Sequence, residues 1–334
     1  MSQRIGEDNN GDNGAITAAT LSAIAYCDTE ASIVNSLKNS LPDWSLAWIP
    51  DVEINGNYAY IAYNETAQQY AVAIRGSVLD FSWQAFEDWF EQDFNVIYQS
   101  DWTYPTGDQN PKTSRGASDG LSDLTSLVST TTGKQVRMLD FLLQTAVAND
   151  TSILVTGHSL GGGLATVFAP WLYYQIASAK KTVPFMPVMT FAAPAVGNQA
   201  FASAYDTTFP SSWRYYNSQD IVPMASASIT NMGDLYSPAP EASSISTTYD
   251  GITVTLQDAI IALDGVVVGS EIYYDSVYTQ TNAASGSVEL NAAGKLFTVT
   301  ATDPLEQWFE QAGAQHSLSN AYLPFLGGQS FTCS

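Results

Sequence analysis

Residues 153–163 read ILVTGHSLGGG, so an apolar run leads into a serine that has a glycine two positions away on each side. When such a serine stands between a strand and a helix, the chain must turn sharply, and only small residues at 157 and 161 permit that turn. The turn exposes the hydroxyl, and the first N–H groups of the following helix point at the same place. Ser159 is therefore the candidate nucleophile for acyl transfer, and the Leu160 N–H is a candidate oxyanion donor.

A serine nucleophile needs a general base, and histidine is the usual one. The chain contains two histidines, His158 and His316. We expect the side chain of His158, next to the nucleophile, to point away from the turn. His316, within AGAQHSLSNAY, is left as the predicted base.

The carboxylate that orients the histidine is expected between positions 159 and 316, because enzymes with this serine turn place their acid between nucleophile and base. Asp220 lies in NSQDIVP, directly after the strand-like run WRYYN (213–217), where a loop can present a carboxylate to the histidine. Asp206 and Asp234 are the alternatives, but neither follows a strand so directly. The sequence therefore favours Asp220.

A second oxyanion donor is expected in a loop that follows another strand. Arg75-Gly76-Ser77 fits this place, because Gly76 lets the backbone approach a substrate and Ser77 can offer its N–H or its hydroxyl. The alternative is that Ser77 only caps the next turn.

The pattern of the chain predicts an N-terminal helix at 15–27, an antiparallel hairpin at 58–63 and 70–77, a loop at 100–120 and helical structure at 121–149. Strand-like runs at 152–156, 187–193 and 213–217 then alternate with helical segments, which is typical of a mostly parallel sheet. Apolar alternation predicts further strands at 252–256, 266–269, 287–290 and 296–300, and so an inserted β-rich region at about 224–300.

The 33 acidic and 11 basic residues give a formal net charge of −22 at pH 7. Nucleic acid is excluded as a partner, because phosphate binding requires clustered Lys and Arg. No apolar run of about 18 residues is present, so we predict no transmembrane segment. We interpret the acidity as a feature that favours solubility or adaptation to salt or cold.

The chain has two cysteines, Cys27 and Cys333, and too few histidines near them for a structural metal site. From the residues alone the two cysteines either pair or stay unpaired. Residues 1–14 are polar and predict a flexible tail without an apolar signal segment. The chain is thus mature, exported without a cleaved signal, or cytosolic.

The chain resembles the class 3 lipase family, which includes secreted fungal triacylglycerol lipases, feruloyl esterases and phospholipases. The resemblance runs over most of the chain, through TLSAIAYC (20–27), AVAIRGS (71–77), VTGHSLGGGLA (155–165), TFAAPAVGN (190–198), NSQDIVP (217–223) and HSLSNAYL (316–323). It implies one α/β-hydrolase domain over residues 15–334, with a mostly parallel central sheet, flanking helices, a helical lid at about 78–97 and the β-rich insertion before the histidine.

Carried over position by position, the resemblance implies Ser159, Asp220 and His316 as catalytic triad, with Ser77 and Leu160 at the oxyanion hole. It also implies a disulfide between Cys27 and Cys333, and with it a secreted protein in an oxidising setting. A cytoplasmic location is the alternative.

The segment FSWQAFEDWFEQDF (81–94) falls where the family carries its lid, a helix that covers the site in water and moves aside at a lipid surface. Its large aromatic residues would then face lipid. The alternative is that they pack on the core. The residues predicted for this face are Trp83, Phe86, Trp89, Phe90 and Phe94.

These observations predict a carboxylic ester hydrolase, and in the first place a triacylglycerol lipase that forms an acyl-enzyme and needs no metal or organic cofactor. Its partner would be a lipid ester at an oil–water interface. A phospholipase A1 and a feruloyl or other soluble-ester esterase are the nearest alternatives, since they share the triad. A lipid-binding scaffold without catalysis is the alternative from another class.

Overall fold

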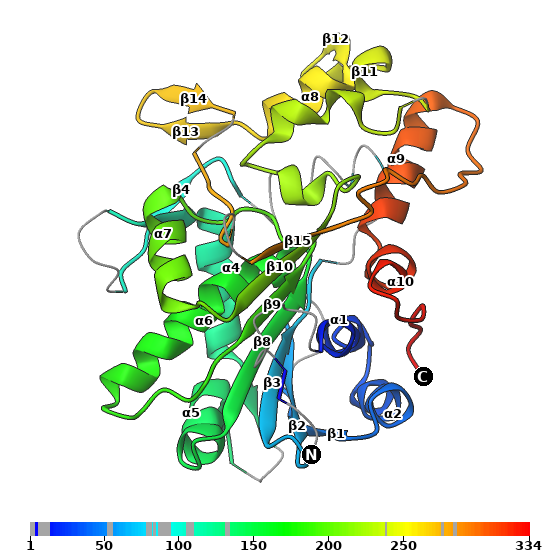
Figure 1. The fold of residues 1–334 in the computed structure, drawn as a ribbon. Helices are drawn as coiled ribbons and strands as arrows, with labels where there is room; N and C mark the ends of the chain where they lie inside the picture. The colour runs from blue at the N-terminus through cyan, green and yellow to red at the C-terminus, as the bar shows by residue number, and fades with distance from the viewer. Residues whose placement is uncertain are drawn as a thin grey trace.

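The computed structural model describes residues 4–5, 14–51, 56–77, 82, 85, 95–104, 110–130, 134–237, 239–274, 277–282 and 286–334. The described part is layered, with a seven-stranded sheet between two groups of helices (Figure 1). Apolar side chains cover both faces of this sheet and form two buried clusters. The core is thus divided by the sheet.

The strand order in the central sheet is β1-β2-β3-β8-β9-β10-β15. β1, β2 and β3 are antiparallel neighbours, whereas every pairing from β3 to β15 is parallel. The predicted mostly parallel sheet and the predicted hairpin are therefore confirmed. The strands are β1 (Trp44–Trp48), β2 (Ala59–Asn64), β3 (Gln69–Ile74), β8 (Ser152–His158), β9 (Val188–Phe191), β10 (Ser212–Asn217) and β15 (Ser287–Leu290).

Two helical layers cover the sheet (Figure 1). On one face lie α1 (Ala15–Ile24), α2 (Glu30–Ser40), the π-helical turn η6 (Leu318–Tyr322) and α10 (Leu323–Phe325). On the other lie α4 (Arg115–Ser126), α5 (Met138–Leu142) with its π-helical continuation η2 (Leu143–Val147), α6 (Leu160–Ser178) and α7 (Gln199–Thr208). α9 (Pro304–His316) leads from the edge of the sheet into η6.

The predicted loop at 100–120 is wrong over its second half. β4 (Gln99–Asp101) pairs with β5 (Lys112–Ser114), and α4 begins at Arg115, where the Ser114 hydroxyl accepts the Ala117 N–H at 3.2 Å. Gly120 suggested a loop, but its missing side chain serves helix packing: a Cβ there would lie 2.7 Å from the Leu164 side chain of α6. Helix 121–149 is likewise interrupted, by the short pair β6 (Val128–Ser129) and β7 (Val136–Arg137).

Within residues 224–300 the strands predicted at 252–256 and 266–269 are confirmed, and each pairs with a strand that was not predicted. Two ribbons form, β11 (Ser246–Tyr249) with β12 (Ile252–Thr255) and β13 (Val266–Val268) with β14 (Glu271–Tyr273). The helix α8 (Leu256–Leu263) between them was not predicted, and neither were the 3₁₀ turns η3 (Val222–Met224), η4 (Ile229–Asp234) and η5 (Ala242–Ser244). Both ribbons and α8 lie beyond the carboxyl ends of the central strands (Figure 1).

Two further strand predictions have different outcomes. Residues 287–290 form a strand, β15, as predicted. This strand pairs with β10 at the edge of the central sheet and does not belong to a separate β-rich region. The strand predicted at 296–300 is wrong: the N–H groups of Thr300 and Ala301 donate to the Glu310 carboxylate rather than to a neighbouring strand. An alternating pattern cannot separate these cases, because a side chain can replace the partner strand as hydrogen-bond acceptor.

Of the predicted flexible tail, residues 1–14, the described residues are Arg4, Ile5 and Gly14. Ile5 is buried, and its N–H donates to the Gln69 side chain at 3.1 Å. The tail is thus attached to β3 at this point. The boundaries of one hydrolase domain with an insertion remain a prediction.

The disulfide between Cys27 and Cys333 is present, as the resemblance implied, with the two Cα atoms 5.6 Å apart. It joins the chain just after α1 to the C-terminal segment, and the Ser334 N–H donates to the Ser36 hydroxyl of α2 at 3.0 Å. The C-terminal segment is therefore attached to the helical layer of α1 and α2. Among the described residues, no helix has the length and apolar character needed to cross a membrane.

Replacing both cysteines by serine should lower the free energy of unfolding by about 2–5 kcal/mol, because the disulfide closes a very long loop and so restricts the unfolded chain. Urea unfolding with and without reductant measures this effect. The double variant is its own control, since reductant should not change it further. Equal stability of parent and double variant would contradict the prediction.

Candidate active site

Ser159 occupies the sharp turn between β8 and α6 that the sequence predicted. Its backbone has φ 59° and ψ −132°, a left-handed conformation that costs a non-glycine residue roughly 1–3 kcal/mol. The Ser159 N–H donates to the Phe191 carbonyl of the neighbouring strand at 2.9 Å, which helps to hold the turn. A Cβ at Gly161 would collide with the Ile74 carbonyl, so the α6 start can approach β3 only with glycine here.

The structure brings Ser159, His316 and Asp220 together in one buried chain of hydrogen bonds. His316 Nε2 lies 2.8 Å from Ser159 Oγ, and His316 Nδ1 lies 2.8 Å from Asp220 Oδ2. Ser159 and Asp220 are fully buried, and His316 is 3% exposed. Because Nδ1 faces a carboxylate, it carries the proton, and Nε2 is free to accept the serine proton.

The alternative acid Asp206 does not reach this chain. Its carboxylate accepts the N–H of Asn282, which bonds to Ser212 at the start of β10, whereas Asp220 follows the end of that strand. Burial raises the pKa of the Asp206 carboxyl. Asp234 belongs to η4, and its side chain lies outside the described residues. Asp220 is thus the acid that the geometry favours.

Tyr322 supports Asp220, a role that the sequence pattern did not predict. Its hydroxyl donates to Asp220 Oδ2 at 2.7 Å, and the Val222 N–H donates to Oδ1 at 3.0 Å. Burial, followed by the nearby Asp220 charge, holds the pKa of Tyr322 well above its usual value of 10, so the phenol stays a donor. Tyr322 lies in HSLSNAYL, six residues after His316, but only the π-helical turn η6 brings it back to the acid.

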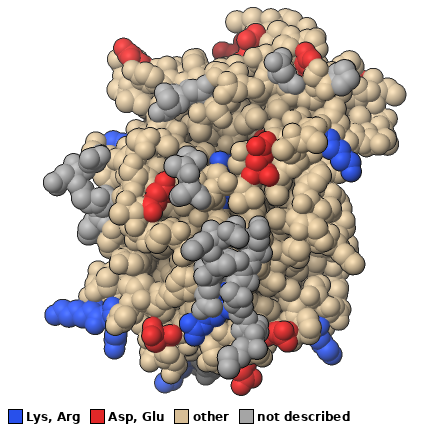
Figure 2. All heavy atoms as spheres, viewed as in Figure 1, with Lys and Arg blue, Asp and Glu red and all other residues tan. Residues whose placement is uncertain are grey.

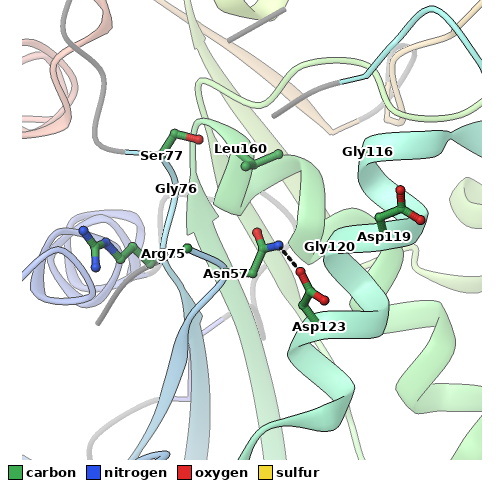
Figure 3. A pocket seen from close by; sticks show the side chains of 10 residues that line it. Asn57, Arg75, Gly76, Ser77, Gly116, Asp119, Gly120, Asp123 and Leu160 are labelled. Carbon is green, nitrogen blue, oxygen red and sulfur yellow. Dashed lines mark hydrogen bonds between the residues drawn. The ribbon is translucent and has the colours of Figure 1, made fainter. Parts of the chain in front are cut away.

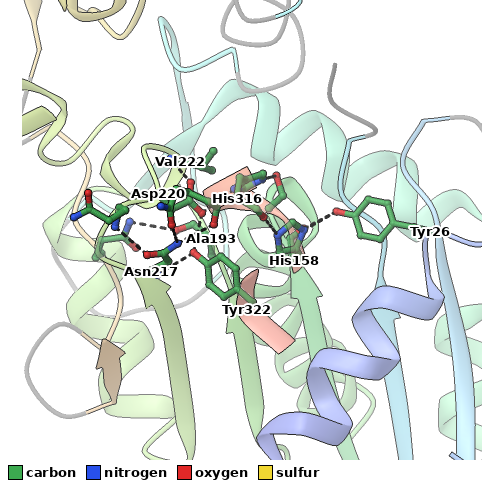
Figure 4. A network of polar contacts seen from close by, with 12 residues as sticks. Tyr26, His158, Ala193, Asn217, Asp220, Val222, His316 and Tyr322 are labelled. Carbon is green, nitrogen blue, oxygen red and sulfur yellow. Dashed lines mark hydrogen bonds and ion pairs between the residues drawn. The ribbon is translucent and has the colours of Figure 1, made fainter. Parts of the chain in front are cut away.

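Asn217 connects the acid-bearing turn to the end of α9 (Figure 4). Its side-chain amide donates to the Gln315 side chain at 2.7 Å and to the Gln315 carbonyl at 2.9 Å, while its oxygen accepts the Gln219 N–H. Its own N–H donates to the Tyr322 hydroxyl at 3.0 Å. The end of β10, just before Asp220, is therefore hydrogen-bonded directly to Gln315, the residue before His316.

His158 bonds to the backbone of the other histidine, and the centroids of the two rings lie 4.7 Å apart. Its Nε2 lies 2.9 Å from the His316 carbonyl, and its Nδ1 lies 2.9 Å from the Tyr26 hydroxyl (Figure 4). A carbonyl only accepts, so Nε2 carries the proton and Tyr26 donates to Nδ1. Burial, and then the proximity of His316, lowers the pKa of His158 well below 6.5, which keeps the ring neutral.

Ser77 and Leu160, the predicted oxyanion residues, lie near each other in the wall of one cavity (Figure 3). Ser77 follows β3, and Leu160 is the first residue of α6. Both line a cavity of about 420 Å³ that also contains Asn57, Asp119 and Asp123. Their roles as oxyanion donors remain predictions.

Ser77 also lines a second cavity, of about 440 Å³, on the His316 side. Tyr26, His158 and Phe331 contribute to its wall, and Phe331 belongs to the C-terminal segment held by the disulfide. Space for a substrate therefore lies on both sides of Ser77.

The predicted lid face lies outside the described residues, so its orientation remains a prediction. This applies to Trp83, Phe86, Trp89, Phe90 and Phe94. Within the described part of the chain, no group of His, Cys, Asp and Glu is arranged to hold a metal ion.

Comparison with known proteins gives one family match. The family model described as "Lipase (class 3)" matches residues 71–229, which include Ser77, Ser159 and Asp220. His316 and the disulfide lie outside the matched segment.

Two curated relatives match over short segments. A Caenorhabditis elegans protein named lipase ZK262.3 is 42% identical over 71 residues, which are 21% of this chain and 19% of that protein. An Arabidopsis thaliana protein named phospholipase A(1) DAD1, chloroplastic, is 35% identical over 81 residues, 24% of this chain and 17% of that protein. The chain thus spans less than a fifth of the length of these relatives.

A solved structure is similar over nearly the whole chain. The crystal structure of M37 lipase superimposes with a TM-score of 0.66 and 24% identity, covering 96% of this chain and 94% of that one. At this identity the similarity establishes the fold, which is that of a lipase-type α/β-hydrolase.

Tyr322→Phe should slow the reaction of Ser159 with a fluorophosphonate probe by roughly tenfold, because Asp220 loses a charge-assisted donor and holds His316 less firmly. The matched control is Tyr205→Phe, which removes the buried hydrogen bond between Tyr205 and Ser212. Both variants should lose about 1 kcal/mol of stability. Equal labelling rates in the two variants would show that Tyr322 does not position the acid.

The free energy of unfolding should fall as the pH drops below 6.5, the ordinary pKa of histidine. The folded pKa of His158 lies lower, so below 6.5 the unfolded chain takes up a proton that the folded chain does not. The loss is at most about 1.4 kcal/mol per pH unit for this group, down to its folded pKa.

Urea unfolding of the parent and of His158→Gln at pH 7.5, 6.5 and 5.5 measures this dependence. The introduced glutamine keeps an N–H donor for the His316 carbonyl but cannot titrate, so the stability of the variant should fall less steeply. Parallel pH profiles for the two proteins would refute the assignment to His158.

Proposed function

Because residues 71–229 belong to the class 3 lipase family, we propose that this chain is a carboxylic ester hydrolase, with triacylglycerols as its main substrates. The observation that carries the proposal is the buried chain Ser159–His316–Asp220, with 2.8 Å between the atoms of each contact. In this fold such a chain activates a serine for attack on an ester carbonyl.

In the proposed reaction, Ser159 Oγ attacks the carbonyl carbon while His316 Nε2 takes the hydroxyl proton. Asp220 stabilises the imidazolium that forms and keeps the ring in the correct orientation. His316 then returns the proton to the oxygen of the leaving alcohol, and the acyl group stays on Ser159. Water, deprotonated by the same histidine, releases the acid and restores the serine.

The tetrahedral oxyanion would bind to the Leu160 N–H and to Ser77. Leu160 opens α6, where free N–H groups and the helix dipole favour negative charge. Ser77 comes from a separate strand, so two independent elements would hold the oxyanion. Such donors are already in place before the charge develops, which lowers the barrier.

The leaving alcohol must lie near His316 Nε2, because this atom protonates it. The cavity of about 440 Å³ beside His316 is the place that meets this requirement. The other cavity, on the far side of Ser77, contains Asp119 and Asp123 and is suited to polar groups rather than to a fatty acyl chain. A long acyl chain would therefore need further apolar surface, which the predicted lid at about 78–97 would supply.

Phospholipase A1 activity is the second candidate function, because a curated relative matched over 81 residues is named a phospholipase A(1). Soluble-ester hydrolysis and lipid binding without catalysis are less favoured. The disulfide supports a secreted protein, since such bonds persist in oxidising compartments.

Hydrolysis of p-nitrophenyl esters, emulsified triglycerides and phosphatidylcholine tests the proposal. The parent should hydrolyse long-chain triglycerides, and Ser159→Ala should lose at least about 10⁴-fold in turnover. Phosphatidylcholine as the preferred substrate would establish the phospholipase, and activity limited to short soluble esters would establish an esterase. Absence of any activity would favour a lipid-binding protein without catalysis.

The acid is tested in the same assay by Asp220→Asn, with Asp206→Asn as the matched control. Asp220→Asn should lower kcat by about 10³–10⁴-fold, because asparagine favours the wrong tautomer of His316. Asp206→Asn changes a carboxylate that bonds only to the Asn282 N–H among the described contacts, so its kcat should stay within about twofold. The reverse order of effects would move the acid to Asp206.

A further inference from the structure

Exposed apolar side chains gather at one place on the described surface. Among the described residues, nine large apolar side chains are exposed, and five of them lie on the β13–β14 ribbon or beside it. We call these five the ribbon patch. Its members and their exposed fractions are Tyr98 (52%), Val268 (42%), Ile272 (57%), Tyr273 (43%) and Tyr274 (40%).

The patch extends over both faces of the ribbon, because the pairing of Val268 with Glu271 places Val268 and Tyr273 on the face opposite Ile272 and Tyr274. The Val267 N–H donates to the Ile97 carbonyl at 2.8 Å, which places Tyr98 next to β13. Ile272 and Tyr274 share one face of their strand, and both lie over Gly265, within about 3 Å of where a Cβ of that glycine would be.

The ribbon is attached firmly to the body of the protein. The buried Tyr278 hydroxyl donates to the Val96 carbonyl at 2.9 Å, just before the segment that bonds to β13. Val96 itself is 1% exposed and belongs to the main core. The exposed side chains therefore project from a fixed element, so their exposure is a property of the fold.

The ribbon projects beyond the carboxyl ends of the central strands (Figure 1). Ser159 follows the carboxyl end of β8, and Asp220 follows that of β10, so the ribbon patch and the catalytic residues belong to the same end of the molecule. A surface that bound this ribbon would also face the opening of the site.

The charges near the patch do not favour an anionic surface, since Arg115, whose N–H bonds to the Tyr98 carbonyl, lies 3.9 Å from the Asp119 carboxylate. Between Arg214 and Lys295 the sequence contains no Lys or Arg, and the whole chain carries a net charge of −22. The ribbon's own charged residue, Glu271, accepts a hydrogen bond from the Tyr273 hydroxyl at 2.6 Å. In Figure 2 the upper part of the molecule, which includes the ribbon, is covered mainly by uncharged residues.

The size of the patch argues against a second protein chain. Five half-exposed large side chains offer roughly 500 Å², whereas a stable protein interface needs about 800 Å² from each partner. Tyrosine and β-branched residues on a narrow ribbon suit the boundary between lipid and water, where the tyrosine ring is buried and its hydroxyl stays hydrated.

We propose that the ribbon patch docks onto an uncharged lipid–water interface and so turns the catalytic end of the molecule toward lipid. The inference rests on the proposed function for its biological purpose, but binding can be measured without turnover. The docking side chains come from residues 98 and 268–274, and Tyr98 directly follows the predicted lid at about 78–97.

The test is flotation of the full-length Ser159→Ala protein with triolein droplets coated with phosphatidylcholine. The double variant Ile272→Glu/Tyr274→Glu should lower the fraction bound by at least about tenfold, because two buried contacts are lost and charge is introduced. The control is Val34→Glu, which changes an equally exposed apolar residue on α2, far from the ribbon. It should bind within twofold of the parent.

Two further measurements exclude other causes. Ile272→Ser/Tyr274→Ser introduces no charge and should still lower binding several-fold, while its thermal unfolding matches that of the parent. With Ser159 intact, the ribbon variants should hydrolyse soluble p-nitrophenyl acetate at the parent rate, since no residue of the patch belongs to the triad.

Unchanged flotation of both ribbon variants would overturn the proposal. Stronger binding after phosphatidylglycerol is added would overturn the choice of an uncharged surface. A dimer in sedimentation equilibrium that the ribbon variants dissociate would assign the patch to a second copy instead. If the parent floats but hydrolyses no ester, the proposed function fails and the docking surface stands. If the parent hydrolyses esters while the ribbon variants float as well as it does, the docking surface fails and the proposed function stands.

Discussion

The position of His316 is the constraint on which the rest of the site depends. Its two ring nitrogens contact Ser159 and Asp220, and its carbonyl accepts from His158. Ser159 and Asp220 are separated from it by 157 and 96 residues, so no local structure can bring the three together. Only a sheet with the correct strand order, and a helix, α9, that ends at the correct residue, can do so.

The elements around this point all restrict the freedom of one buried imidazole. Asn217 and Gln315 connect the turn after β10 to the end of α9, and Tyr322 returns from η6 to the acid. His158 supports the backbone of His316 from the opposite side, with Tyr26 of the α1 end behind it. A catalytic histidine must pick up and return a proton without moving away, and this shell of hydrogen bonds restrains it from both sides.

The segment between Asp220 and His316 is long, yet the triad forms across it. It leaves the central sheet after β10, forms two ribbons and α8, and returns as β15 beside β10. Because β15 pairs with the strand that precedes the acid, the segment leaves and rejoins the sheet at the same edge. This arrangement leaves its ribbons free to carry surface features, such as the exposed apolar side chains of β13 and β14.

The sequence by itself determined the chemistry of the site. The glycines at 157 and 161 require a tight turn around Ser159, and a chain with two histidines leaves few choices for a base. Strand runs such as 152–156 were equally clear, because continuous apolar residues between turn signals indicate a buried strand. The first half of α4, residues 115–120, was missed because Gly116 and Gly120 suggest a loop, whereas the absent side chain of Gly120 allows α4 to pack closely on α6.

The tertiary structure alone decided which groups support the triad and how the insertion folds. Tyr26, Asn217 and Tyr322 are ordinary polar residues in the sequence, and their roles arise from contacts between segments far apart in the chain. The same reason separates 287–290, which found a partner strand, from 296–300, which found the Glu310 carboxylate instead. Local patterns specify what a segment can form, but the partners that satisfy its hydrogen bonds and cover its apolar face are supplied by the fold.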